Sequence, residues 1–112
     1  TILKAEIIPG LFREDEWGGV NDLHLLENGK IEAIGHIAQQ VEGVKNYYAI
    51  GFIFDPKTRE FSDLKIIATV EDCPPVEKKT SEIGSVFYPG GFRAPYLYGG
   101  VGDTKAVRVK IV

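Results

Sequence analysis

The chain has 112 residues, of which 44% are hydrophobic and 26% charged, and its formal net charge is −3. This composition is ordinary for one small globular domain, and no basic stripe marks a nucleic-acid binder. The apolar runs are far shorter than the roughly 20 residues that span a bilayer, so we expect no membrane partner. The single cysteine, Cys73, excludes an internal disulfide and suits a reducing compartment, which predicts a cytoplasmic protein.

The start of the chain is ambiguous. Residue 1 is threonine and methionine is absent from the whole sequence, so we interpret the chain as part of a longer protein. Residues 1–12 fit either a short strand or a single helical turn, which Pro9-Gly10 would end.

Four short strands are predicted within residues 22–70. Asn28-Gly29 separates two apolar runs and suits the centre of a type I′ hairpin turn, in which both residues need a positive φ. A loop over residues 39–45 leads to a strand at 47–54, rich in aromatic and β-branched side chains. Asp55-Pro56 then begins a turn before a strand at 64–70. These segments predict one antiparallel four-stranded meander.

A second, three-stranded unit is predicted after a polar boundary at residues 72–81, where Pro74-Pro75 cannot join a central ladder. Its strands are expected at 83–88, 96–101 and 105–112, with turns at 89–91 and 102–104. The last strand alternates apolar and charged residues, which is typical of a half-exposed strand near an edge. A helical period sustained over 12 residues is absent, so the sequence predicts an all-β chain.

Repeated four-stranded meanders at a spacing of about 45 residues are typical of propeller blades. We therefore predict two antiparallel blades of a β-propeller, the first over residues 13–71 and the second, incomplete, over 82–112. Two blades cannot close a ring, so the partner is expected to be the remainder of the parent chain or further copies of this one.

Three of the six candidate site residues lie in the run from Glu16 to Asp22, at the mouth of the first predicted strand. Asp22 is expected to begin the innermost strand, with Asn21 beside it, and their oxygens and amide suit sugar hydroxyls. A strand-end aspartate that accepts backbone N–H groups is the alternative. Trp17 is suited either to stack on a sugar ring or to pack two blades together.

The two histidines lie on the two arms of the first hairpin. His24 is expected on the same strand face as Asp22, but two ligands are weak evidence for a metal, and we predict none. His36 alternates with apolar residues, which fits either a packed core histidine or a site residue. Tyr47, Tyr48, Tyr96 and Tyr98 are interpreted mainly as blade packing, and Cys73 as inert.

With these segments in view, the chain resembles a family long described as of unknown function, found in bacteria and in Leishmania. The strings that carry the resemblance are EWGGVNDLHLLENGKIEAIGHIA (16–38), YYAIGFIFDP (47–56), LKIIAT (64–69) and LYGGVGDTKAVRV (97–109). Members resemble five-bladed β-propeller mannoside phosphorylases, and the Leishmania members are mannosyltransferase/phosphorylases of β-1,2-mannan. The resemblance implies that residues 1–112 are the C-terminal part of one such propeller.

The resemblance also implies two roles. It places His36, within Gly35-His36-Ile37, at a phosphate, although the family pattern has tyrosine and glycine on either side of the histidine. It places Asp103, within the string YGGVGD, at a sugar hydroxyl. The general-acid aspartate of the family belongs to an earlier blade, so we expect no catalytic residue in this chain.

The first functional hypothesis is therefore part of an enzyme that phosphorolyses or transfers mannosyl units, with the chain inactive by itself. Its expected site residues are Trp17, Asn21, Asp22, His24 and Asp103 for an oligosaccharide and His36 for phosphate. No cofactor is expected, because inorganic phosphate or a sugar phosphate serves as co-substrate. The alternatives are a non-catalytic carbohydrate-binding or assembly module and a structural fragment.

Overall fold

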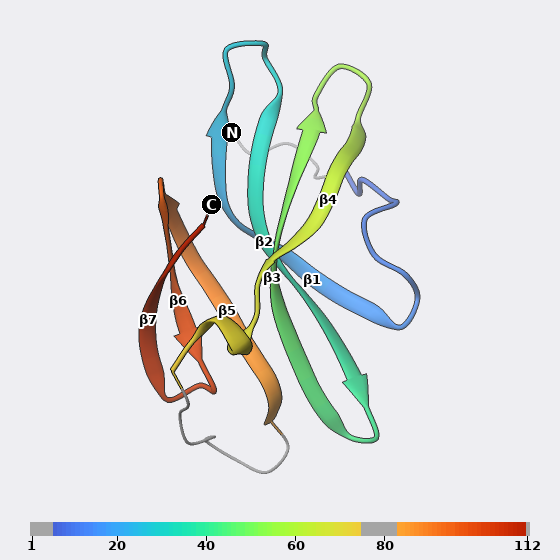
Figure 1. Cartoon of the computed structure of the whole chain (residues 1–112). Helices are drawn as coiled ribbons and strands as arrows, with labels where there is room; N and C mark the ends of the chain where they lie inside the picture. The colour runs from blue at the N-terminus through green and yellow to red at the C-terminus, as the bar shows by residue number, and fades with distance from the viewer. Residues whose placement is uncertain (1–5, 75–82, 112) are drawn as a thin grey trace, which may run out of the picture.

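The computed structural model describes residues 6–74 and 83–111, and in this part of the chain it contains seven strands and one short 3-10 helix (Figure 1). The elements are β1 (Glu16–Leu25), β2 (Ile31–Val41), β3 (Val44–Asp55), β4 (Glu60–Ala68), η1 (Val70–Asp72), β5 (Ile83–Arg93), β6 (Tyr96–Val101) and β7 (Lys105–Lys110). The all-β prediction is confirmed. Residues 6–12 form neither strand nor helix, and residues 1–5 of the ambiguous segment lie outside the described residues.

The first four strands form the predicted antiparallel meander, in which β2 pairs with β1 and β3, and β4 pairs with β3. The strands are longer than the sequence predicts. For example, β1 already begins at Glu16, and β3 covers Val44–Asp55 instead of 47–54. The turn that begins at Asp55 is confirmed: its side chain accepts a bond of 2.9 Å from the Lys57 N–H, and its backbone oxygen accepts one of 2.7 Å from Arg59.

Two turns differ from the predictions. The hairpin at Asn28-Gly29 is present, but only Gly29 has a positive φ, of 82°, so the turn is not type I′. Its loop has three residues, closed by bonds between Leu26 and both Gly29 and Lys30, which is the G1-bulge arrangement. The type I′ geometry is instead found at Glu42 and Gly43, with φ values of 50° and 80°, where the sequence predicts a longer loop.

In the second group of strands, β6 has the predicted bounds and β7 begins as predicted but ends at Lys110, whereas β5 differs from the prediction. The prediction of a turn at Pro89-Gly90-Gly91 is wrong, because β5 continues through these residues to Arg93. The ladder between β5 and β6 shifts register between Pro89 and Gly91, so Gly90 is the extra residue of a bulge. A bulge tolerates proline within a strand, which explains why a proline-glycine run does not end β5 here.

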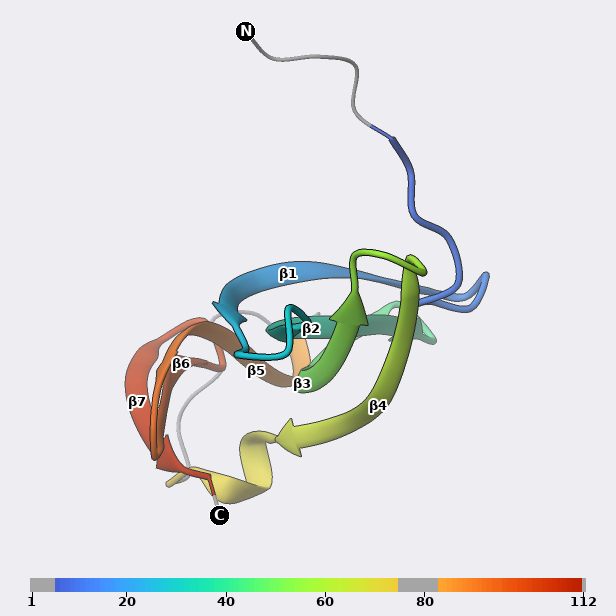
Figure 2. The same cartoon turned by 90° about the horizontal axis from the view of Figure 1, so that it is seen from above.

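The two groups of strands share one ladder, whereas the sequence predicts two separate units. The N-terminal end of β3 pairs in parallel with β5, at Lys45 with Ile83 and at Tyr47 with Val86. The other end of β3, from Ala49 onward, pairs with β4. All seven strands therefore form one open sheet, in which β5, β6 and β7 curl away from the plane of the meander (Figure 2).

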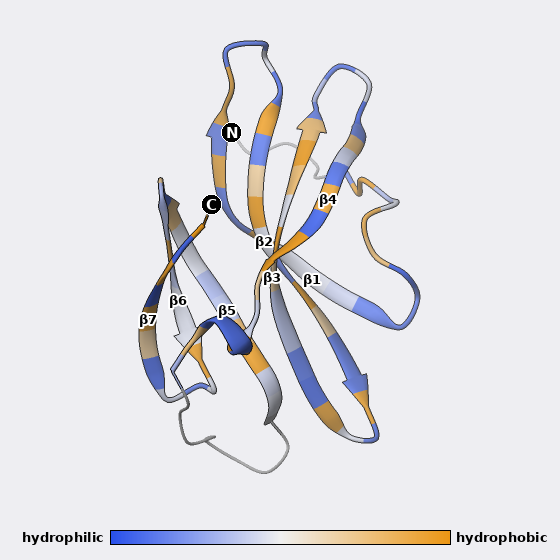
Figure 3. Cartoon of the chain, in the orientation of Figure 1, coloured by the Kyte–Doolittle hydropathy of each residue, from blue (hydrophilic) through white to orange (hydrophobic). Residues whose placement is uncertain are grey.

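The main core lies between the two groups. Ile34, Ala49 and Ala68 lie on one face of the meander. Their side chains pack against Phe87 and Leu97, which are fully buried. We call this the inner face of the meander. Because successive side chains of a strand point to opposite faces, the intervening residues form the opposite, outer face. Apolar residues are spread along the strands of the meander (Figure 3) and occur on both faces.

The outer face carries a second apolar cluster, built on Ala33, Ile50 and Phe52 and partly covered by Leu11 and Phe12 of the N-terminal segment. Beside this cover lies an apolar hollow of about 670 Å³. Large apolar side chains of the neighbouring strands β1 and β4 stay exposed on this face, among them Val20, Leu23, Leu25 and Ile66. This face is therefore an apolar surface without a full cover. Among the described residues, no helix has the length and apolar character needed to cross a membrane.

Candidate functional site

The site is built on an irregularity in β1. The register between β1 and β2 shifts between Val20 and Asp22, which leaves Asn21 as the extra residue of a bulge. Asp22 does not begin the first strand, as the sequence predicts, but lies in its middle, opposite Ile34. Because directly paired residues share a face, Trp17, Asp22 and His24 all lie on the inner face, toward β5.

Asp22 joins the two groups of strands. Its Oδ2 accepts a hydrogen bond of 2.8 Å from the backbone N–H of Phe92 in β5, and its Oδ1 accepts one of 2.9 Å from Leu23. The bond from Phe92 is the main reason that the pKa of Asp22 lies below its ordinary value of 3.8; the Leu23 bond and His24 add to this, and burial opposes it. This contact has the form of the structural alternative, an aspartate that accepts backbone N–H groups, although its side chain is still 31% exposed.

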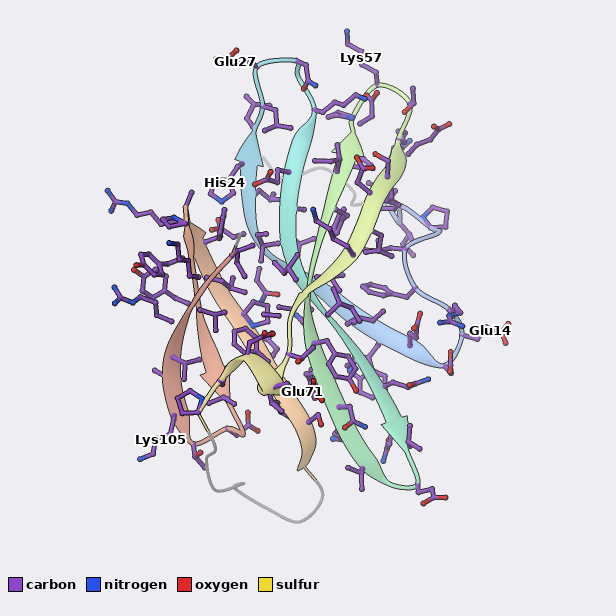
Figure 4. All side chains as sticks on the ribbon, in the orientation of Figure 1. Glu14, His24, Glu27, Lys57, Glu71 and Lys105 are labelled. Atoms are coloured by element: carbon purple, nitrogen blue, oxygen red, sulfur yellow. The ribbon has the colours of Figure 1, made fainter. Side chains whose placement is uncertain are left out.

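His24 lies beside Asp22, on the side of β1 that faces β5 (Figure 4). Its Nε2 is 3.3 Å from Asp22 Oδ2, and its ring stands edge-on to Phe92 at a centroid distance of 6.0 Å. This nitrogen is buried and has no hydrogen-bond partner among the described residues. In that part of the chain no group of three or more potential metal ligands is found, so Asp22 and His24 remain a pair.

His36 is held by the bulge residue. Its Nδ1 is 2.8 Å from Oδ1 of Asn21, an oxygen that only accepts, so Nδ1 carries the proton in a neutral ring. Burial lowers the pKa of His36 below its ordinary value of 6.5, which favours this neutral form near pH 7. The opposite nitrogen, Nε2, then accepts a hydrogen bond from a ligand and donates one only when the ring is charged.

The His36 ring belongs to a group of four neighbouring rings, and we call Trp17, His36, Tyr47 and Tyr88 the aromatic cluster. The Tyr88 ring lies 4.5 Å from the His36 ring, centroid to centroid, with an interplanar angle of 35°. Tyr47 contacts both at 6.0 and 6.1 Å, and Trp17 meets Tyr47 edge-on at 6.2 Å. Trp17 and Tyr88 remain 39% and 42% exposed, so the cluster presents aromatic surface to solvent.

Asp103 lies in the turn between β6 and β7, with a positive φ of 56°. It lines an open groove of about 520 Å³, and Tyr88, whose ring contacts His36, lines the same groove. The structure thus brings together Asp22 with His24, and Asn21 with His36 and the aromatic cluster that includes Trp17.

Tyr88 is not among the site residues predicted from the sequence, and Tyr47 was interpreted mainly as blade packing. In the strand predicted at 83–88, Tyr88 follows the apolar Phe87, so alternation directs the two side chains to opposite faces, and this was the available signal. The structure buries Phe87 fully. The backbone N–H of Phe92, the partner of Asp22, carries no signal in the sequence. Burial and the nearby charge of Asp72 raise the pKa of the Cys73 thiol, as expected for an unreactive cysteine.

Comparison with known protein families assigns the chain to one of them. Residues 1–112 match a family described as protein of unknown function (DUF1861). The chain belongs to this family. No functionally curated protein matches it.

Three solved structures from Leishmania are similar to the chain. Mannose phosphorylase MPT-4 of Leishmania mexicana, solved with a phosphate ion, is 34% identical over 90% of this chain, with a TM-score of 0.82. A hypothetical protein from Leishmania major is 35% identical over 92%, with a TM-score of 0.79. MPT-1 of Leishmania mexicana, a GDP-Man-dependent mannosyltransferase, is 31% identical over 88%, with a TM-score of 0.77.

The chain spans only 35–36% of the length of these three proteins. Its similarity to a mannose phosphorylase and a mannosyltransferase relates this DUF1861 chain to carbohydrate-active enzymes.

Proposed function

We propose that this DUF1861 chain forms two adjacent blades of a five-bladed β-propeller that phosphorolyses or transfers mannosyl units. Residues 13–71 would be the first blade and residues 82–112 the second, incomplete one. The observation that carries the proposal is the 34% identity, over 90% of the chain, to a mannose phosphorylase solved with phosphate. The apolar outer face of the meander adds support, because a neighbouring blade would cover it.

In this proposal His36 contacts phosphate. Asn21 holds its ring through Nδ1 and Tyr88 packs on the ring, so Nε2 is the nitrogen left for a ligand. A neutral ring accepts a hydrogen bond from the P–O–H group of a hydrogenphosphate through Nε2, and a charged ring donates one to a phosphate oxygen. Since burial lowers the pKa of His36, the first of these contacts applies near pH 7.

The reaction needs an acid that this chain does not supply. The acid, from another part of the parent protein, would protonate the glycosidic oxygen while a phosphate oxygen attacks the anomeric carbon. The C–O bond to the leaving sugar breaks, the leaving oxygen keeps the proton, and a mannosyl phosphate forms. Trp17, Asn21, Asp22, His24 and Asp103 are proposed to contact the saccharide. The 112 residues alone are expected to be inactive.

The test is an NMR titration of the protein with inorganic phosphate and, separately, with mannose. The change from His36 to Ala should weaken phosphate binding by about 10- to 150-fold, the loss of a charge-assisted bond of about 1.5–3 kcal/mol, and leave mannose binding nearly unchanged. Gln40→Ala, at an exposed position of the same strand, is the matched control. An equal loss for phosphate and mannose in His36→Ala would contradict the phosphate role.

A non-catalytic carbohydrate-binding module is the second candidate, favoured by the exposed rings of Trp17 and Tyr88. The two candidates differ in one assay on the full-length parent protein. The enzyme releases mannosyl phosphate from a mannoside and phosphate, whereas the binding module binds the mannoside and releases none.

A further inference from the structure

The groove that Asp103 lines has a second exposed tyrosine. Tyr88 and Tyr98 are 42% and 45% exposed, and both line this groove of about 520 Å³. Tyr88 pairs with Gly100, and Tyr98 precedes Gly100 by two residues, so both rings lie on the same face of the β5–β6–β7 sheet. That face is the one opposite the core, because Phe87 and Leu97, which alternate with them, are fully buried.

The floor between the two rings is made of glycines that packing does not require. A Cβ at Gly90 would lie 3.5 Å from the backbone oxygen of Tyr98, and one at Gly100 would lie 3.9 Å from the backbone oxygen of Lys105. Both are ordinary van der Waals contacts. Neither residue has a positive φ. Gly99 differs, since its Cβ would overlap the backbone oxygen of Tyr88, at 2.5 Å. Glycine within a strand costs about 0.5–1 kcal/mol relative to alanine, and it marks either a bulge, as at Gly90, or a close approach of a ligand or another backbone. Gly100 is outside the bulge, so it is the glycine of the floor that points to a ligand.

Polar groups stand at one end of the groove. Asp103 and Lys105, at the β6–β7 turn, both line it, and neither forms a salt bridge within the described part of the chain. A carboxylate accepts from sugar hydroxyls and an ammonium donates to them, while a tyrosine ring packs against the apolar C–H face of a hexose. Rings at the sides with charged groups at one end therefore match the two chemical surfaces of a hexose.

We propose that this groove, between Tyr88 and Tyr98, is a subsite for a second hexose unit of an oligosaccharide. Tyr88 forms the shared wall, since its ring packs on His36 and borders the groove. The neighbouring hexose unit would lie at the aromatic cluster, so the groove recognises a chain of at least two sugars. This inference rests on the proposed function in one respect, namely that the ligand is a mannosyl saccharide.

A purely structural role for the tyrosines makes a different prediction. An aromatic ring laid over a strand glycine stabilises a sheet, and Tyr88 is directly opposite Gly100. In that case the loss of Tyr98 lowers the melting temperature but leaves saccharide binding unchanged.

The experiment compares the binding of mannobiose, mannose and inorganic phosphate by calorimetry, at a concentration where all variants share one oligomeric state. Tyr98→Ala removes one ring, and Gly100→Val fills the floor at a position where a Cβ has room. Both should weaken mannobiose binding by about tenfold or more and change mannose and phosphate binding by less than about twofold. Tyr96→Ala is the matched control, because Tyr96 is on the same strand but packs under Arg108, at 4.4 Å, outside the groove.

Three results overturn the subsite. If Tyr98→Ala and Gly100→Val bind mannobiose like the unchanged protein, the groove does not hold a sugar. If the unchanged protein binds mannobiose no more tightly than mannose, a second hexose unit is not recognised, while phosphate binding lost in His36→Ala still supports the proposed function. If the unchanged protein binds neither saccharide nor phosphate, the proposed function fails and the subsite fails with it.

Discussion

The bond between Asp22 and the Phe92 N–H makes the most direct prediction about how the two groups of strands are held together. Asp22→Ala removes the only side-chain acceptor that the described residues provide for this N–H. We expect β5 to open more readily at Phe92, because a backbone N–H that was bonded to a carboxylate loses its partner. The meander itself should be unaffected, since its ladders run through backbone groups.

The magnitude follows from the charge and exposure of Asp22. A hydrogen bond to a charged group contributes about 1.5–3 kcal/mol, and we take the lower end because the Asp22 side chain is 31% exposed. About 1.5 kcal/mol corresponds to roughly a tenfold increase in the opening equilibrium. Asp22→Asn keeps a neutral acceptor of the same shape, so it should increase opening by less.

The pH dependence has a defined sign. The folded-state pKa of Asp22 lies below its ordinary value of 3.8, so the folded state favours the carboxylate. Its stabilisation is fully present above pH 3.8 and is lost as the pH falls through the lowered folded-state pKa. The difference between the unchanged protein and Asp22→Ala should therefore be largest near neutral pH and shrink in strong acid.

The assay is amide hydrogen exchange at Phe92, measured by NMR at several pH values. Asp15→Ala is the matched control, because Asp15 is an exposed carboxylate immediately before the same strand, bonded only to the Gln39 side chain. An unchanged exchange rate at Phe92 in Asp22→Ala, or an increase that persists unaltered in strong acid, would refute the reasoning.

Three further predictions concern packing, titration and assembly. Gly18→Ala should destabilise the fold by about 1–3 kcal/mol, since a Cβ there would overlap the backbone oxygen of His36. Gly19→Ala should be tolerated, because its Cβ would lie 3.5 Å from the His36 ring, and the melting temperatures of the two variants test this difference. Because the pKa of His36 is lowered in the folded state, the free energy of unfolding should decline as the pH falls below 6.5. His36→Gln should flatten this decline in urea titrations, and the same pH dependence in the variant and the unchanged protein would contradict the prediction. The exposed apolar outer face should drive self-association at tens of micromolar, measured by light scattering; a soluble, cooperatively melting monomer would replace the propeller-blade interpretation with a small sandwich or barrel.

The sequence by itself determined the local features of this protein. Alternation along residues 105–111, the aromatic and β-branched run before Asp55 and the Asn28-Gly29 dipeptide each predict a strand or turn within a few neighbouring residues, and all three are present. Turn type and strand length were predicted less well. Glu42 occupies a left-handed conformation that its side chain does not favour, because the long ladder between β2 and β3 holds it there.

The tertiary structure alone decided which residues meet at the site. Asn21 contacts His36 because a bulge shifts β1 against β2, and Asp22 reaches Phe92 across 70 positions of the chain. Pro89 and Gly90 remain inside β5 because β6 pairs on both sides of their bulge, which overrides the local preference for a turn. Tyr88 reaches His36 only because β5 joins β3 in parallel. Such contacts depend on the register between distant strands, and hydrophobic periodicity predicts a strand and its faces but not its distant neighbour.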